Sequence, residues 1–111
     1  MAVAKKQKSN DMQSCIQICQ ECHAICLATA AYCLEKGFKE QARILLDCAE
    51  IGQTCMNFML RGSSRHHLTC GVCAEICNLC AESCNKIFDD KQLKHCADVC
   101  QRCAVVCNEI A

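Results

Sequence analysis

Cysteines at regular three- and four-residue intervals are the feature of this sequence that points most directly to chemistry. The densest stretch runs from Cys70 to Cys84 and places cysteine at positions 70, 73, 77, 80 and 84. An α-helix turns about 100° per residue, so these steps confine the sulfurs to one stripe about 80° wide. Polar residues such as Glu75 and Glu82 fall between them and suit an exposed face. The stretch therefore predicts a helix whose buried edge is lined with thiols.

The spacing C-x3-C-x2-C-x3-C occurs three times in the chain, which is far more specific than a single C-x2-C. All sixteen cysteines are candidate metal ligands, and most of them belong to these rows or extend them. They are Cys15, Cys19, Cys22, Cys26, Cys33, Cys48, Cys55, Cys70, Cys73, Cys77, Cys80, Cys84, Cys96, Cys100, Cys103 and Cys107.

Length and composition narrow the class of protein. At 111 residues the chain is long enough for one small domain. The formal net charge is zero and aromatic residues are scarce, so nothing indicates a nucleic acid or an anionic membrane surface as a partner. Proline is absent, which permits long helices with short connections.

So many cysteines in a short chain are typical of disulfide-rich secreted proteins, but the N-terminal sequence favours another compartment. Residues 1–8 carry lysines without a following apolar segment, so no signal peptide is visible, and no apolar run approaches membrane-spanning length. We therefore expect a cytoplasmic location that keeps the thiols reduced. Cysteines in one stripe share a helix and would not cross-link distant segments, although bridges between facing helices remain open.

The apolar periodicity predicts four helices and a short basic extension. We expect residues 1–9 to form a flexible tail and residues 10–111 to form a single domain. The helices are expected at about 11–36, 39–61, 65–88 and 91–110.

Turn signals separate these helices. Asn10 or Asp11 is expected to cap the first helix, and Gly37 is expected to end it. Gly62-Ser63-Ser64 provides a stop signal and a new N-cap, and Asp89-Asp90 provides the last N-cap.

Four helices of similar length with short connections predict an all-α fold, an antiparallel up-down four-helix bundle with a cysteine-lined core. In this topology the first and third connections share one end of the bundle. Both termini and the second connection share the other end.

The row spacing favours soft metal ions. Thiolates at i and i+4 lie one turn apart and suit a two-coordinate ion. Six such pairs exist: 15/19, 22/26, 73/77, 80/84, 96/100 and 103/107. Multiple Cu(I) ions would also neutralise buried thiolates about one for one, as a dry core requires.

Other metals fit the pattern less well, and they remain alternatives. Zinc prefers closed groups of four ligands, and a long helical row offers no obvious fours. Ferredoxin-type clusters use loop spacings and a proline that the chain lacks. A zinc or cadmium sink and a thiol-based redox or iron–sulfur protein are therefore the alternatives to a non-catalytic Cu(I) store.

The chain resembles the bacterial copper storage proteins, specifically their cytosolic, Csp3-like type. The resemblance is carried by the three cysteine rows, by the sparse Cys48 and Cys55, and by His95 directly before Cys96, and it covers about residues 11–108. It implies a bundle that fills with many Cu(I) ions bound by core thiolates, often as a homotetramer. The twin-arginine signal of exported members is absent. The third connection holds only one histidine, whereas relatives can have several.

The resemblance also implies a direction of loading. Relatives admit copper near the position of His95, so His95 joins the cysteines as a candidate metal residue of the entrance.

We expect His23 to be a hydrogen-bonded interface residue, and His66 and His67 to lie on the surface. Three methionines, Met12, Met56 and Met59, are expected to close the opposite end as apolar filling, and transfer of copper by their thioethers is the alternative.

Overall fold

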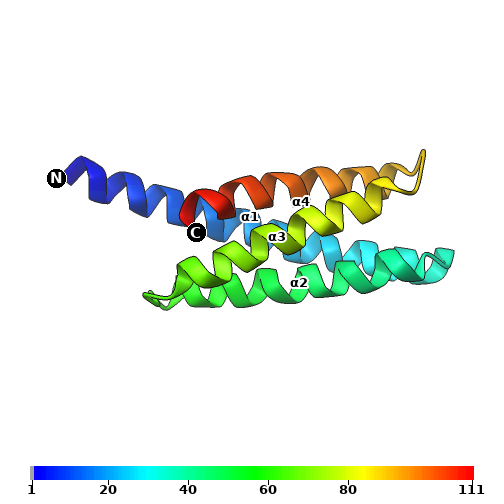
Figure 1. Ribbon diagram of the computed structural model, residues 1–111, viewed down its shortest axis with the longest axis horizontal. Helices are drawn as coiled ribbons and strands as arrows, with labels where there is room; N and C mark the ends of the chain where they lie inside the picture. The colour runs from blue at the N-terminus through cyan, green and yellow to red at the C-terminus, as the bar shows by residue number, and fades with distance from the viewer. Residues whose placement is uncertain (1) are drawn as a thin grey trace.

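Four α-helices account for nearly all of the chain (Figure 1). The structure is a computed structural model that describes the backbone of residues 2–111 and the side chains of residues 11–111. The helices are α1 (Ala2–Lys36), α2 (Lys39–Leu60), α3 (His66–Asn85) and α4 (Lys91–Ile110). In the part of the chain described, none of them combines the length and apolar character needed to span a membrane.

The helix boundaries agree with the sequence except at two places. The first helix begins at Ala2 instead of at the expected cap near Asn10, because alanine, lysine and glutamine favour a helix and nothing in this segment breaks one. The third helix ends at Asn85, three residues earlier than expected. The flexible tail over residues 1–9 stays a prediction, since the side chains there lie outside the described residues.

Left-handed glycines end the first two helices, as the sequence indicates. Gly37 has φ +82°, and the N–H of Phe38 donates to the carbonyl of Cys33 over 2.8 Å, which is the closing bond of a Schellman motif. Gly62 has φ +66° and ends α2 in the same way. These tight endings bring the next helix back antiparallel without a long loop.

The two remaining helix starts differ. Asp90 caps α4 as predicted, and its carboxylate accepts a hydrogen bond of 3.0 Å from the N–H of Leu93. At α3 the N-cap expected within Gly62-Ser63-Ser64 is wrong, because Arg65 occupies the N-cap position without a side-chain bond. The hydroxyl of Ser63 is used within the turn, where it accepts from the N–H of Arg65 over 3.2 Å.

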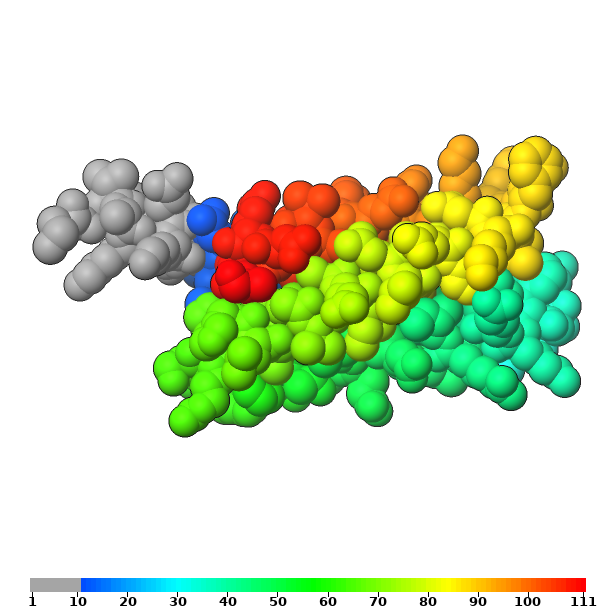
Figure 2. Space-filling view, in the orientation of Figure 1, coloured from blue at the N-terminus to red at the C-terminus, as the bar shows by residue number. Residues whose placement is uncertain are grey.

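The helices form an antiparallel up-down bundle. The first helix contacts α2 and α4, and α3 contacts the same two helices on the other side. The α1–α2 and α3–α4 connections lie at one end, which we call the turn end (Figure 1). Both termini and the α2–α3 connection lie toward the other, the terminal end. In the space-filling view, α3 lies across its neighbours and their side chains close the face shown (Figure 2).

The core is lined with sulfur. All sixteen cysteines have 0% exposure, whereas the larger aliphatic residues that are fully buried are only Leu45, Leu93 and Val99 among the described side chains. Small alanines such as Ala97 and Ala104 fill the space beside the cysteines. The predicted cysteine-lined bundle is therefore confirmed.

Candidate metal centre

The shortest sulfur–sulfur contacts join different helices. They are Cys55–Cys70 at 3.4 Å, Cys15–Cys107 at 3.5 Å, Cys19–Cys107 at 3.6 Å and Cys48–Cys77 at 3.6 Å. All sixteen thiols are free. Each helix therefore places sulfurs against those of its neighbours, and a column of buried thiols lies along the bundle axis.

Contacts within single helices are also present. Three of the six predicted i, i+4 pairs are in contact: Cys22–Cys26 at 3.8 Å, Cys73–Cys77 at 3.9 Å and Cys103–Cys107 at 3.8 Å. The helical spacing thus brings sulfurs together as expected. The distances between helices are equally short, which the spacing alone did not indicate.

Groups of four sulfurs form where the four edges meet. One group takes a single cysteine from each helix, namely Cys19, Cys55, Cys73 and Cys107, and all four sulfurs lie within 4.8 Å of one another. A second group consists of Cys22, Cys26, Cys48 and Cys100, and a group of three consists of Cys22, Cys77 and Cys103. The expectation that the rows offer no groups of four ligands for zinc is therefore wrong, because cysteines from different helices combine into such groups.

These separations suit a metal ion between the sulfurs. A metal–sulfur bond of about 2.3 Å places two ligand sulfurs about 3.8 Å apart in a tetrahedron, about 4.0 Å apart in a trigonal site and about 4.6 Å apart in a linear site. The Cys22 sulfur lies 3.8 Å from those of Cys26 and Cys100 and 3.9 Å from that of Cys48. The column therefore requires little rearrangement to accept metal ions.

The electrostatics of the column favour bound cations. Burial raises the pKa of Cys33 to about 11, and the nearby carboxylate of Asp90 adds to the effect. Farther inside, the thiols of Cys100 and its neighbours donate hydrogen bonds that lower the pKa of Cys22, and the same network raises the pKa of Cys100. A dry core cannot hold many thiolates together unless positive ions compensate them.

The turn end carries the predicted entrance histidine on its surface. His95 is exposed, and its sequence neighbour Cys96 is fully buried. None of the three sulfur groups in the described part of the chain includes a histidine, so His95 lies outside the column. Tyr32 fastens this end by donating a hydrogen bond of 2.6 Å to the carboxylate of Asp90, which ties α1 to the start of α4. A surface hollow at this end is lined by residues 85, 87–91 and 94.

Of the other three histidines, His23 and His67 lie as the sequence indicated, and His66 is less exposed than expected. The Nδ1 of His23 is 2.6 Å from the carbonyl oxygen of Ala49, so this side chain is a hydrogen-bonded residue of the α1–α2 interface. His67 is exposed. His66 is partly buried, and its Nδ1 lies 3.0 Å from the carbonyl oxygen of Ser63.

Two buried residues lie in register with the cysteines or in contact with them, and neither was singled out for this position from the sequence. Thr29 has 0% exposure and lies three residues after Cys26 and four before Cys33, so it continues the cysteine spacing of α1. At the terminal end, the Sδ of Met59 lies 4.0 Å from the Sγ of Cys70. Both residues continue the three- and four-residue spacing of the cysteines on their helix, and this spacing was the signal available in the sequence.

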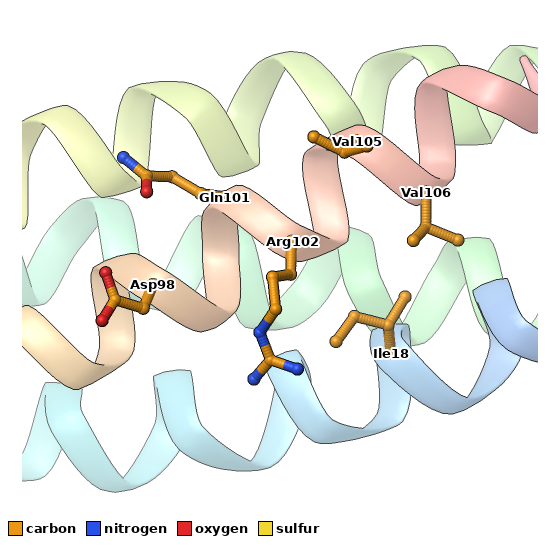
Figure 3. A pocket seen from close by; sticks show the side chains of 6 residues that line it. All are labelled: Ile18, Asp98, Gln101, Arg102, Val105 and Val106. Carbon is orange, nitrogen blue, oxygen red and sulfur yellow. The ribbon is translucent and has the colours of Figure 1, made fainter.

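The groove between the outer surfaces of α1 and α4 is not part of the metal centre. It is lined by Ile18, Asp98, Gln101, Arg102, Val105 and Val106, none of which carries sulfur (Figure 3). Arg102 extends across it toward α1 and forms an exposed salt bridge of 3.2 Å with Glu21. An ion pair in this setting contributes little to stability.

Comparison with known proteins points to one family. The sequence model of the copper storage proteins matches residues 2–111 of this chain. Comparison with curated proteins finds no significant match.

Solved structures of similar proteins share the whole fold. A protein of Nitrosospira multiformis, Nmul_A1745, is 41% identical and superposes with a TM-score of 0.85, over 93% of this chain and 96% of that one. The apo form of copper storage protein 3 from Bacillus subtilis is 30% identical, with a TM-score of 0.84 over 89% of this chain and 97% of that one. The Cu(I)-bound copper storage protein BsCsp3 is 28% identical, with a TM-score of 0.86 over 91% of this chain and 98% of that one.

Proposed function

This chain belongs to the copper storage protein family, and we propose that its sulfur column is a store for many Cu(I) ions. The observation that carries the proposal is the complete burial of sixteen free thiols along the bundle axis, most of which contact another cysteine sulfur within 4.0 Å. A Cu(I)-bound relative with the same fold supports the choice of metal.

The chemistry of the column matches Cu(I). Thiolates are soft ligands, and Cu(I) accepts two or three of them without a demanding geometry. A thiolate that bridges two ions allows each Cu(I) to cancel about one buried negative charge. Every loaded thiol must release its proton, so loading exchanges protons for metal ions within the same space. We expect all sixteen cysteines to act as ligands.

We further propose that copper enters at the turn end. Tight helix packing surrounds the column along its length, so an ion reaches the interior from an end. His95 is exposed and directly precedes the buried Cys96 in the chain, and Cys33 and Cys84 are the other cysteines toward this end. An imidazole binds Cu(I) more weakly than thiolates do, so it passes the ion inward to Cys96 and Cys100.

The setting that we propose is a cytoplasmic, non-catalytic homotetramer. Free thiols are maintained in a reducing compartment. A buried column of metal ligands suits storage better than catalysis. Exposed apolar residues on one side of α3, Leu68, Val72 and Leu79, are 60%, 48% and 50% exposed and offer a surface for a second copy. Light scattering at several protein concentrations tests the tetramer.

Titration with Cu(I) tests the storage function. Reduced apo-protein is titrated under anaerobic conditions against a competing Cu(I) chelator, and uptake is expected to continue to roughly one ion per thiol. Saturation at one or two equivalents would exclude storage and favour a copper chaperone.

A zinc or cadmium sink is the second candidate, because the group with one cysteine from each helix has the four ligands that zinc prefers. Competition distinguishes the two functions. We expect equimolar Cu(I) to displace Zn(II) from the loaded protein, whereas retained Zn(II) would support the second candidate.

A further inference from the structure

A thioether sulfur lies against the last thiols of the column at the terminal end. The Sδ of Met59 is 4.0 Å from the Sγ of Cys70, and that sulfur is 3.4 Å from the Sγ of Cys55. Met59 is only 3% exposed, and both cysteines are fully buried. Three sulfurs from α2 and α3 therefore meet in one enclosed corner of the core.

We propose that Cys55, Cys70 and Met59 form a three-coordinate Cu(I) site, with two thiolates and one thioether, that closes the sulfur column. This site rests on the proposed storage function. Ligand sulfurs of a trigonal site with bonds of about 2.3 Å lie about 4.0 Å apart. The separation of Met59 and Cys70 already has this value, and that of Cys55 and Cys70 has to widen only slightly.

The spacing of Cys55 and Met59 along α2 places the thioether on the same side of the helix as the Cys55 thiol. Met59 follows Cys55 by four residues, which turns it only about 40° from the cysteine around the helix. Met56 follows Cys55 by one residue and is turned by about 100°. Met56 is also buried, with 6% exposure. Among the described side chains, Met59 is the methionine whose sulfur contacts a cysteine sulfur. Met56, about one helical turn from Met59, is therefore a matched control for substitutions of Met59.

A thioether at this place has two chemical consequences. It is neutral, so it adds a third soft donor without adding negative charge to a buried site. It also selects between metals, because thioethers favour Cu(I) while zinc sites use thiolate, imidazole and carboxylate ligands. The terminal site is therefore specific for copper, although it shares Cys55 with the group of one cysteine from each helix. Met59 fills volume at this end, as a plug would, and also provides a ligand.

Methyl NMR distinguishes coordination from packing. The full-length reduced protein is prepared with 13C-labelled methionine methyl groups and loaded stepwise with Cu(I), and in a second sample with Zn(II). Met59→Leu and Met56→Leu assign the signals, and both substitutions retain apolar volume. We expect the methyl signal of Met59 to shift with Cu(I) and to remain in place with Zn(II), while that of Met56 stays in place throughout.

Affinity provides the second measurement. Loss of an outer-shell partner of a metal site weakens binding about 10- to 100-fold, and loss of a ligand has at least that effect. Met59→Leu is therefore expected to weaken the affinity for one Cu(I) ion by about tenfold or more. Met56→Leu is expected to leave the affinity for every Cu(I) ion unchanged. Equal effects of the two variants, or a stationary Met59 signal at full loading, would overturn the site while leaving storage intact. An equal shift with Zn(II) would identify a packing change and overturn it too. A wild-type protein that takes up no Cu(I) would overturn both proposals.

Discussion

Removal of Cys22 tests whether copper is held by groups of thiols or by thiols acting singly. The Cys22 sulfur contacts those of Cys26, Cys48, Cys77 and Cys100 at 3.8 to 4.0 Å. It also belongs to two of the three sulfur groups. We expect each group to hold at least one ion, so Cys22→Ala is expected to remove about two equivalents of Cu(I).

The matched control for this variant is Cys33→Ala. Cys33 lies on the same helix and has the same 0% exposure, but it belongs to none of the three groups. This variant is expected to lose about one equivalent or less. Both variants remove one buried sulfur, so each lowers the free energy of unfolding of the apo-protein by about 1–2 kcal/mol, a typical value for a small core deletion.

Capacity is measured by anaerobic Cu(I) titration with a competing chelator and by native mass spectrometry. The two variants are compared at equal helicity, judged by circular dichroism. Equal losses from Cys22→Ala and Cys33→Ala would refute the grouped arrangement, since they would mean that each thiol contributes independently of its neighbours.

Three further predictions concern uptake, folding and pH. His95→Ala is expected to slow Cu(I) uptake from a chelator in stopped-flow experiments without changing final capacity, and equal rates or slowing by Met59→Ala would place the entrance at the terminal end. The apo-protein is expected to be fully helical by circular dichroism, because buried thiols also act as small apolar residues, and a random-coil spectrum would contradict this. The pKa of Cys33 rises from the ordinary 9.0 to about 11, so the folded state keeps a proton that the unfolded chain loses. Apo stability is therefore expected to fall as pH rises between about 9 and 11, and less steeply in Cys33→Ala, as denaturant melts at fixed pH would show.

The arrangement of the bundle could be predicted because its signals are local. Three- and four-residue cysteine steps fix one face of each helix, and Gly37 and Asp90 mark where helices end and begin. The start of α1 was placed too late, since a helix continues through favourable residues even where a later asparagine or aspartate offers a cap.

The details of the metal centre could be predicted only in part. The i, i+4 pairs follow from helix geometry, but the group of Cys19, Cys55, Cys73 and Cys107 depends on the axial offset of four helices. That offset is set by packing between helices, which the sequence does not express as a period. The contact of Met59 with Cys70 was missed for the same reason, although Met59 continues the register of α2.

The metal content of the protein isolated from copper-supplemented cells tests the storage function most directly. Protein is purified anaerobically without added metal, and copper, zinc and iron are quantified per chain together with free thiols. The structure predicts many copper ions per chain with little zinc or iron, because sixteen buried thiols share one column. One or two copper ions at most, or a predominance of zinc or iron, would contradict the assignment as a copper store.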